Sequence, residues 1–335
     1  MEKILEVNDL HVTFSTFGGT VQAVRGVSFD LHKGETLAIV GESGCGKSVT
    51  SNAIMRLIPD PPGKISNGTI EFKGKDLTQF SQKAMRSIRG VDISMIFQDP
   101  MTALNPTLTI GTQLVEGLME HRKTSRAEAK ERALEMMNLV GIPNPEERFK
   151  QYPHQFSGGM RQRIVIAIAL ICEPELLIAD EPTTALDVTI QAQILELFET
   201  IQEQTGVSII LITHDLGVVA KIADRIVVMY AGKIIEEGTR KEIFYHPEHP
   251  YTKGLLKSVP RLDIKGANLI PIDGTPPDLF SPPQGCPFTA RCSMAMEVCD
   301  KVYPLQTELS DTHKVDCWLQ DDRAEQLVAQ AADKT

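Results

Sequence analysis

Hydrophobic residues occur along the chain in two alternating patterns. Largely apolar runs, typical of strands that are buried on both faces, occur at residues 36–40, 93–97, 176–179 and 208–213. After the third run, Asp187 would cap a helix whose apolar residues fall on one face, at Ile190, Ile194, Leu197, Phe198 and Ile201. Because buried strands alternate with helices, we expect an α/β fold with a mostly parallel sheet covered on both faces.

Other parts of the chain depart from this alternation. Short strands at residues 4–7 and 27–31, and a hairpin of residues 225–229 and 233–236, predict an antiparallel β part. A long segment with helical periodicity predicts a helical subdomain inserted at about residues 100–172.

The composition changes after about residue 240. Residues 260–304 are rich in proline and glycine and hold three of the six cysteines. We therefore divide the chain into a main domain, residues 1–240, and a small irregular C-terminal extension, residues 241–335. A segment so poor in apolar residues needs additional stabilisation, such as a bound metal, in order to fold.

Bulk properties limit the function. The 335 residues are 42% hydrophobic, enough for a sizeable core, and the net charge of −10 disfavours nucleic acid as the main partner. The longest apolar run, residues 164–172, is about half as long as a membrane-spanning helix. No secretory signal is visible, so we expect a reducing cytosol and no structural disulfides.

A glycine-rich loop carries the first sign of chemistry. Residues 41–48 read Gly-Glu-Ser-Gly-Cys-Gly-Lys-Ser, directly after the strand at 36–40 and before a helix. Backbone N–H groups of such a loop bind phosphate, Lys47 would reach the β- and γ-phosphates, and Ser48 would coordinate Mg²⁺. The predicted nucleotide contacts are Gly41, Ser43, Gly44, Cys45, Gly46, Lys47, Ser48 and Val49.

Two carboxylates follow the run at 176–179. Asp180 would hold the same Mg²⁺ as Ser48, and Glu181 is our candidate for polarising the attacking water. Taken alone, Glu181 could equally be a solvated surface carboxylate.

Residues 156–163, Phe-Ser-Gly-Gly-Met-Arg-Gln-Arg, resemble the signature motif of ABC-type ATPases, although Phe156 and Met160 depart from its commonest form. The resemblance implies a P-loop ABC cassette in which two subunits clamp two ATP molecules. Ser157, Gly158 and Gly159 of one subunit would then meet the phosphate loop of the other. ATP would be hydrolysed to ADP and phosphate to drive solute translocation.

The same resemblance implies four further roles, the last of which has two candidate residues. Gln98 matches the glutamine that touches Mg²⁺ and communicates with the membrane partner, and Asp187 belongs to the D-loop. His214 matches the switch histidine that contacts the γ-phosphate, although a lone histidine here is more often a helix-start or core residue. Phe14 and Phe17 are both candidates for the aromatic residue that stacks on adenine.

Residues 246–252, His-Pro-Glu-His-Pro-Tyr-Thr, and the later Cys-Pro-Phe resemble the C-terminal extension of dipeptide/oligopeptide importer ATPases. The prolines favour a rigid loop over a metal pair at His246 and His249. The resemblance implies a peripheral protein at the cytoplasmic face of the membrane, bound to two permease subunits and indirectly to an external peptide-binding protein. Its ATPase partner would be a homologous subunit, in a heterodimer or a homodimer, and the cargo a dipeptide, an oligopeptide or nickel.

Four cysteines gather in the extension, at Cys286, Cys292, Cys299 and Cys317. Four thiolates suit zinc or an iron-sulfur cluster, and their spacings match the common patterns of neither. The resemblance to peptide importers implies a [4Fe-4S] cluster with a structural role.

Two other functions compete with a transport ATPase. A soluble ABC protein of DNA repair or translation is disfavoured, because the segment between Ser48 and Ser157 lacks sustained heptads and the chain has one cassette. An ATPase gated by an iron-sulfur sensor is the second alternative.

Overall fold

The computed structural model of the chain describes residues 2–99, 103–184, 186–258 and 271–324. The start of the predicted helical subdomain, residues 100–102, lies outside the described residues. So do residues 259–270 and 325–335 of the predicted extension.

The main sheet has eight strands in the order β11-β12-β10-β9-β3-β8-β7-β6. Its parallel part consists of β6 (Ile93–Ile96), β7 (Leu176–Asp180), β8 (Ser208–Thr213), β3 (Thr36–Val40) and β9 (Arg225–Tyr230). Every residue of β3, β7, β8 and β9 is buried, as expected for strands covered on both faces. The mostly parallel sheet predicted from the four apolar runs is confirmed, and β10 (Lys233–Thr239) forms the predicted hairpin with β9.

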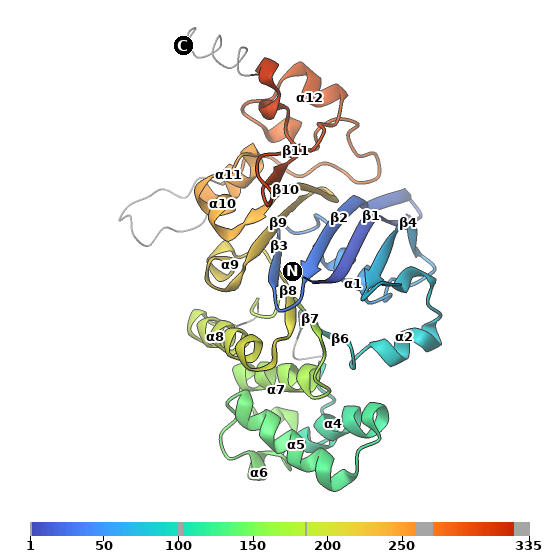
Figure 1. Cartoon of the computed structure of the whole chain (residues 1–335), viewed down its shortest axis with the longest axis vertical. Coiled ribbons are helices and arrows are strands. Elements are labelled where there is room, and N and C mark those ends of the chain that lie inside the picture. Colours follow the sequence, from blue (N-terminus) through green and yellow to red (C-terminus); the bar gives the residue numbers. More distant parts are fainter. Residues whose placement is uncertain (1, 100–102, 185, 259–270, 325–335) are drawn as a thin grey trace.

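A second, antiparallel sheet has the order β2-β1-β4-β5 and lies beside the main sheet (Figure 1). It is formed by β1 (Lys3–Thr16), β2 (Gly19–His32), β4 (Gly63–Phe72) and β5 (Lys75–Asp76). The predicted strands at residues 4–7 and 27–31 are much too short. The β1 register shifts between Val7 and Leu10, and this irregularity interrupts the alternation of apolar and polar residues.

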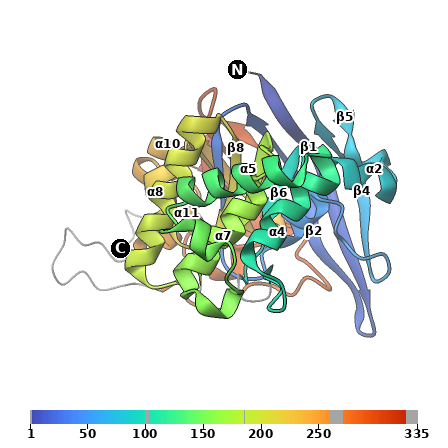
Figure 2. The same cartoon turned by 90° about the horizontal axis from the view of Figure 1, so that it is seen from below.

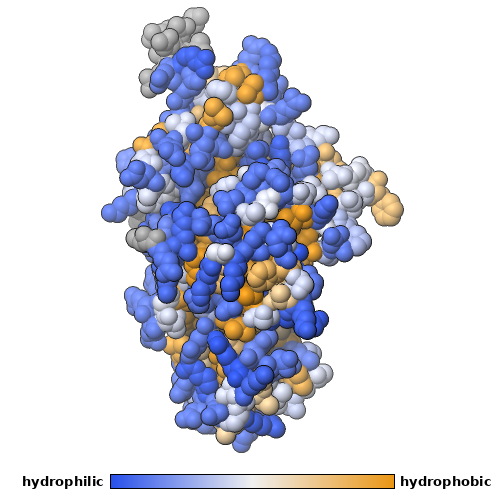
Figure 3. All heavy atoms as spheres, turned by 45° about the vertical axis from the view of Figure 1, so that its right-hand side comes forward, coloured by the Kyte–Doolittle hydropathy of each residue, from blue (hydrophilic) through white to orange (hydrophobic). Residues whose placement is uncertain are grey.

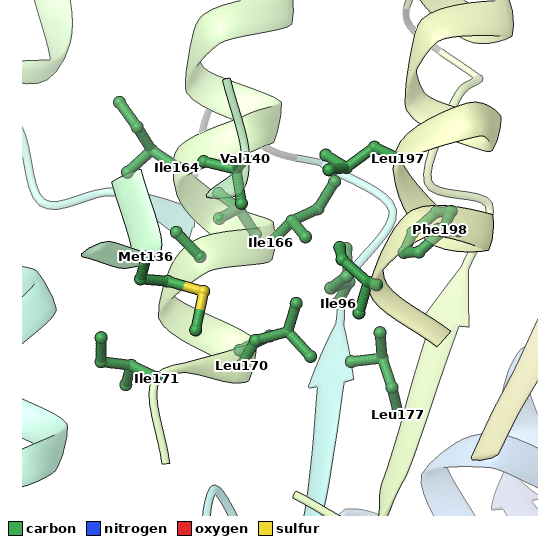
Figure 4. Close-up of a cluster of buried hydrophobic side chains, with 14 of the residues drawn as sticks. Ile96, Met136, Val140, Ile164, Ile166, Leu170, Ile171, Leu177, Leu197 and Phe198 are labelled. Carbon is green, nitrogen blue, oxygen red and sulfur yellow. The ribbon is translucent and has the colours of Figure 1, made fainter. Parts of the chain in front are cut away.

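Four helices gather at the end of the molecule opposite the extension (Figure 1). They are α4 (Ile110–Gly117), α5 (Arg126–Leu139), α6 (Pro145–Arg148) and α7 (Gly158–Leu170), and Figure 2 shows α5 and α7 in front of the sheet. Figure 4 shows how α7 packs on the sheet, with Ile166 and Leu170 near Ile96 and Leu177. This core holds α7 against β6 and β7.

The main sheet is covered by helices α1 (Lys47–Ile54), α8 (Val188–Thr205), α9 (Leu216–Ile222) and α10 (Arg240–Tyr245). Helix α2 (Gln82–Ile88) follows the antiparallel sheet in the chain. The predicted apolar face of α8 is largely confirmed: Ile190 is partly buried, and the face buries Ile194, Leu197, Phe198 and Ile201. Hydrophilic residues cover most of the face in Figure 3, whose apolar residues gather near its middle. Among the described residues, none of the helices combines the length and apolar character required to traverse a bilayer.

The extension includes α11 (Pro250–Lys257) and α12 (Glu297–Lys301). Its strand β12 (Lys314–Val315) pairs with β10, and β11 (Thr307–Glu308) pairs with β12, so the extension continues the main sheet. An aromatic cluster of Tyr230, Tyr251 and Phe288 joins β9 to the extension, with ring centroids 4.5 to 5.3 Å apart. The sequence did not predict this attachment.

Candidate nucleotide-binding site

The phosphate loop connects the end of β3 to the start of α1, and two of its glycines lie against backbone. Gly41 has φ +151°, and a Cβ there would lie 2.2 Å from the carbonyl oxygen of Met229. Gly46 has φ +102°, and its Cβ would lie 2.5 Å from the carbonyl oxygen of Ala23. A side chain at either position would push the loop off β2 and β9.

Lys47 spans the inside of this loop. Its side chain is buried, and Nζ donates hydrogen bonds to the carbonyl oxygens of Gly41 at 2.8 Å and Glu42 at 3.0 Å. The ammonium group is therefore held at the start of a helix, where the helix dipole also favours an anion.

A cavity of about 490 Å³ opens over the loop. It brings three residues that are distant in the sequence next to the loop: Gln98, Glu181 and His214. The full lining consists of Ala23, Glu42, Ser43, Gly44, Gly46, Lys47, Ser48, Val49, Gln98, Glu181 and His214.

Ser48 and Asp180 meet at the floor of the site. The Ser48 hydroxyl donates a 2.9 Å hydrogen bond to Asp180 Oδ1, and Asp180 is 5% exposed. Burial raises the pKa of Asp180, although the Ser48 hydrogen bond opposes this. A hydroxyl and a buried carboxylate are hard oxygen ligands, so this pair fits Mg²⁺.

Glu181 follows β7 and occupies the wall of the cavity. Its carboxylate accepts hydrogen bonds from Gln98 Nε2 and Thr184 Oγ1, both at 3.0 Å, and lies 3.4 Å from His214 Nδ1. Its side chain is 12% exposed, and its backbone N–H donates to the carbonyl oxygen of Ile212. Glu181 is therefore a partly buried, oriented carboxylate that can accept a proton from water in the cavity.

Several predicted contacts lie away from the cavity lining. Gly41 and Cys45 belong to the loop but do not line the cavity, and burial raises the pKa of the Cys45 thiol. Phe14 is partly buried in the core beside Gly63, and Phe17 is fully exposed near the β1–β2 turn. Neither aromatic ring lines the cavity.

The sequence analysis overlooked two residues that line the cavity, Ala23 and Glu42. Ala23 comes from β2 and carries no local signal. Glu42 is inside the recognised loop, but at a position where the motif accepts any residue, so its contacts could not be predicted.

The signature residues also lie outside this cavity. Ser157 caps α7, and its Oγ accepts a hydrogen bond from the Met160 N–H at 3.4 Å. Ser157 and Gly158 are exposed, whereas a Cβ on Gly159 would lie 2.8 Å from Ile190 Cγ2. Asp187 caps α8 by accepting from two backbone N–H groups.

The four cysteines of the extension converge on one small cavity of about 10 Å³, which His249 also lines. None forms a disulfide, and burial raises the pKa of Cys286 to about 11 and of Cys317 to about 12. Within the described ranges, no group of three or more histidine, cysteine or acidic side chains has the geometry of a metal site.

His249 contributes a second feature of this cavity. Its Nδ1 accepts a hydrogen bond from the Tyr251 N–H, and burial lowers the pKa of the ring to about 3. The neutral ring therefore carries its proton on Nε2, which is buried and has no partner in the described chain. Four free thiols and one unpaired N–H therefore face the same cavity.

Comparison with known proteins decides the family. Residues 24–184 match the family described as "ABC transporter", and residues 235–299 match "Oligopeptide/dipeptide transporter, C-terminal region". A dipeptide transport ATP-binding protein of Bacillus subtilis (strain 168) is 72% identical over 328 residues, with 98% of both chains covered. The chain belongs to the ATP-binding proteins of dipeptide and oligopeptide ABC transporters.

Other comparisons agree with this assignment to the ABC ATPases. An oligopeptide transport ATP-binding protein of the same Bacillus is 61% identical over 318 residues, covering 95% of this chain and 89% of the relative. The dimeric structure of the ATP-binding cassette MJ0796, bound to ADP and phosphate, matches with a TM-score of 0.63 and 27% identity. That match covers 70% of this chain and 98% of the other, so this ABC ATPase has the cassette fold.

Proposed function

We propose that this ABC ATPase powers the import of dipeptides or oligopeptides through a membrane permease. The observation that carries the proposal is the cavity in which Lys47 and Ser48 of the phosphate loop face Glu181 and His214. The match of the extension to the peptide-transporter C-terminal region supports a peptide cargo.

The residues in and around the cavity have different roles in ATP hydrolysis. Loop N–H groups and Lys47 bind the phosphates, while Ser48 and Asp180 would hold Mg²⁺, which supplies positive charge to the phosphate oxygens when bound. Glu181 accepts the proton of the attacking water, and Gln98 and Thr184 keep its carboxylate in place. His214 lies beside the same carboxylate and can contact the terminal phosphate.

The active form in this proposal is a dimer of ATPase subunits. Ser157 and Gly158 are exposed at the start of α7 and do not line the cavity of their own chain. They would complete the ATP site of a homologous or identical partner across the interface, next to Asp187. The related MJ0796 cassette has a dimeric structure, which supports this arrangement.

The proposed location is the cytoplasmic face of the membrane, against two permease subunits. Gln98 would transmit nucleotide binding to the permease, and an external binding protein would deliver the peptide. A soluble role in DNA repair or translation is disfavoured by the match to the transporter C-terminal region.

Transport by the complete complex tests this function. Proteoliposomes with the ATPase, its partner and the permease should accumulate a labelled dipeptide or oligopeptide when ATP is supplied, and Lys47→Ala should abolish uptake. Accumulation of nickel in place of peptides would overturn the peptide cargo. ATP hydrolysis without uptake of any solute would overturn the transport function.

We further propose that Cys286, Cys292, Cys299 and Cys317 hold a [4Fe-4S] cluster that stabilises the extension. Support comes from the convergence of the four free thiols and the unpaired N–H of His249 on one cavity. Protein purified without oxygen should contain four iron atoms per chain and absorb broadly in visible light. A colourless protein with stoichiometric zinc would refute the cluster, and unequal ATPase rates of oxidised and reduced protein would favour the gating alternative.

A further inference from the structure

Glu42, the second residue of the phosphate loop, is held by the C-terminal extension. The Arg291 guanidinium donates from Nη1 to Glu42 Oε2 at 2.6 Å and from Nη2 to Glu42 Oε1 at 2.9 Å. The Glu42 N–H donates a 2.9 Å hydrogen bond to the hydroxyl of Tyr251. Two residues far from the loop in the sequence thus contact the side chain and the backbone of one loop residue.

Arg291 is itself fixed in place. Its side chain is 4% exposed, and it also donates to the carbonyl oxygens of Ile272 and Asp273 and to the hydroxyl of Tyr230. The two parallel bonds to Glu42 have the fork geometry that binds a carboxylate most strongly. A lysine at this position would retain the charge and lose the fork.

The position of Glu42 makes this ion pair relevant to nucleotide. Glu42 lines the cavity over the loop, next to Ser43 and Lys47. An unpaired carboxylate there would repel a triphosphate, and the repulsion is strong because a partly buried site screens charge poorly. Arg291 cancels this charge.

We propose that the extension sets the ATP affinity of the phosphate loop, with Arg291 neutralising Glu42 and Tyr251 fixing its backbone. Arg291 and Tyr251 are positioning residues, because they act on ATP through Glu42. Arg291 directly precedes Cys292, and Tyr251 is two residues after His249; both neighbours line the four-cysteine cavity. The two residues that contact the loop are therefore close in the chain to residues that line this cavity.

Equilibrium binding of ATP to the full-length protein, with EDTA present to prevent hydrolysis, tests the proposal. Arg291→Ala should weaken ATP binding by roughly ten-fold at low salt, and less at high salt. Glu42→Gln should bind ATP as tightly as the wild type or more tightly. The double variant Glu42→Gln/Arg291→Ala should recover most of the lost affinity, because the uncompensated charge is gone.

A merely structural ion pair gives a different pattern. Both substitutions would then weaken ATP binding when made singly, and the double variant would bind ATP no more tightly than Arg291→Ala. Either result would overturn the proposal. Unchanged ATP affinity in Arg291→Ala would overturn it as well. If Arg291→Ala does not fold, the ATP affinities of Glu42→Gln and Arg291→Lys still test the proposal. We expect Arg291→Lys to bind ATP less tightly than the wild type, because lysine keeps the charge but makes only one of the two bonds. Wild-type affinity of Arg291→Lys would then overturn the role of the fork.

Two further variants complete the experiment. Tyr251→Phe keeps the ring and removes the hydroxyl that accepts from the Glu42 N–H, so a loss of affinity smaller than that of Arg291→Ala is expected. Lys301→Ala breaks an exposed ion pair with Glu297 inside the extension and should leave ATP affinity unchanged. An equal loss in Lys301→Ala would show that any disturbance of the extension weakens binding, contrary to the proposal.

Discussion

The Ser48 hydroxyl donates a 2.9 Å hydrogen bond to Asp180, which joins the first turn of α1 to the end of β7. Both elements belong to the buried core, so the two oxygen atoms are fixed before any ion binds. Burial raises the pKa of Asp180, and a divalent cation would favour its ionised form. This pair prepares the place where Mg²⁺ is expected.

Replacing Ser48 by alanine removes one of these oxygens. The Mg²⁺ concentration for half-maximal ATPase activity should rise by roughly ten-fold or more, because the remaining carboxylate lacks its partner ligand. Ser51→Ala is a suitable control, since Ser51 Oγ donates to the Ser48 carbonyl oxygen in the same helix. A similar shift in both variants would argue against Ser48 as a ligand.

Glu181→Gln should stop hydrolysis and preserve ATP binding. The amide is nearly isosteric but cannot accept a proton, so kcat should fall by roughly 10²-fold or more. ATP would then remain bound and stabilise the closed dimer, which gel filtration with ATP can detect. Glu175→Gln, at the other end of β7, is the matched control and should hydrolyse ATP normally. Normal turnover by Glu181→Gln would exclude Glu181 as the base.

Whether a feature could be predicted from the sequence depends on how far apart in the chain its interacting residues lie. Strands β3, β7 and β8 were predictable because every residue is buried, and the loop because its glycine spacing is local. The full length of β1 was hidden by the register shift after Val7. The pairing of Arg291 with Glu42 joins residues 249 positions apart, and no local pattern records it.

The same limit applies to the rest of the site. Sequence motifs named Gln98, Glu181 and His214, but only the folded structure shows that Gln98 and His214 lie beside the Glu181 carboxylate. The choice between Phe14 and Phe17 stays open, because neither ring lines the cavity.

Ser157→Ala tests whether the ATP site is completed by a second subunit. Steady-state ATPase activity should fall by about ten-fold or more, while ATP binding to separate subunits should be unchanged. Ser81→Ala is the matched control, because Ser81 also caps a helix through its side chain and lies outside the proposed interface. Each variant should lose about 1 kcal/mol of stability. Equal ATPase activity in the two variants would contradict the shared site.

The stability of the contacts around Glu242 in the extension should decrease at low pH. Glu242 is partly buried, which raises its pKa, but hydrogen bonds from Thr239, Ser310 and Thr312 lower it to about 2. A carboxyl whose pKa falls on folding stabilises the folded state above its unfolded pKa of about 4.5, and this contribution is lost as the pH drops toward 2.

Thermal unfolding between pH 7 and pH 2 measures this contribution. The wild type should lose more stability across that range than Glu242→Gln, whose side chain does not titrate. Glu297→Gln, which removes an exposed carboxylate from the same extension, should behave as the wild type. Parallel pH profiles for wild type and Glu242→Gln would show that Glu242 does not contribute.

The pairing of β12 with β10 bears on how the protein is made. Val315 lies opposite Glu236, so β10 receives its second neighbouring strand from some of the last described residues. During synthesis, β10 leaves the ribosome with the hydrogen-bonding groups of one edge unpaired, because its partner strand β12 is translated much later. Messages truncated before codon 314 should therefore yield chains that associate edge to edge, even though every nucleotide motif is already present.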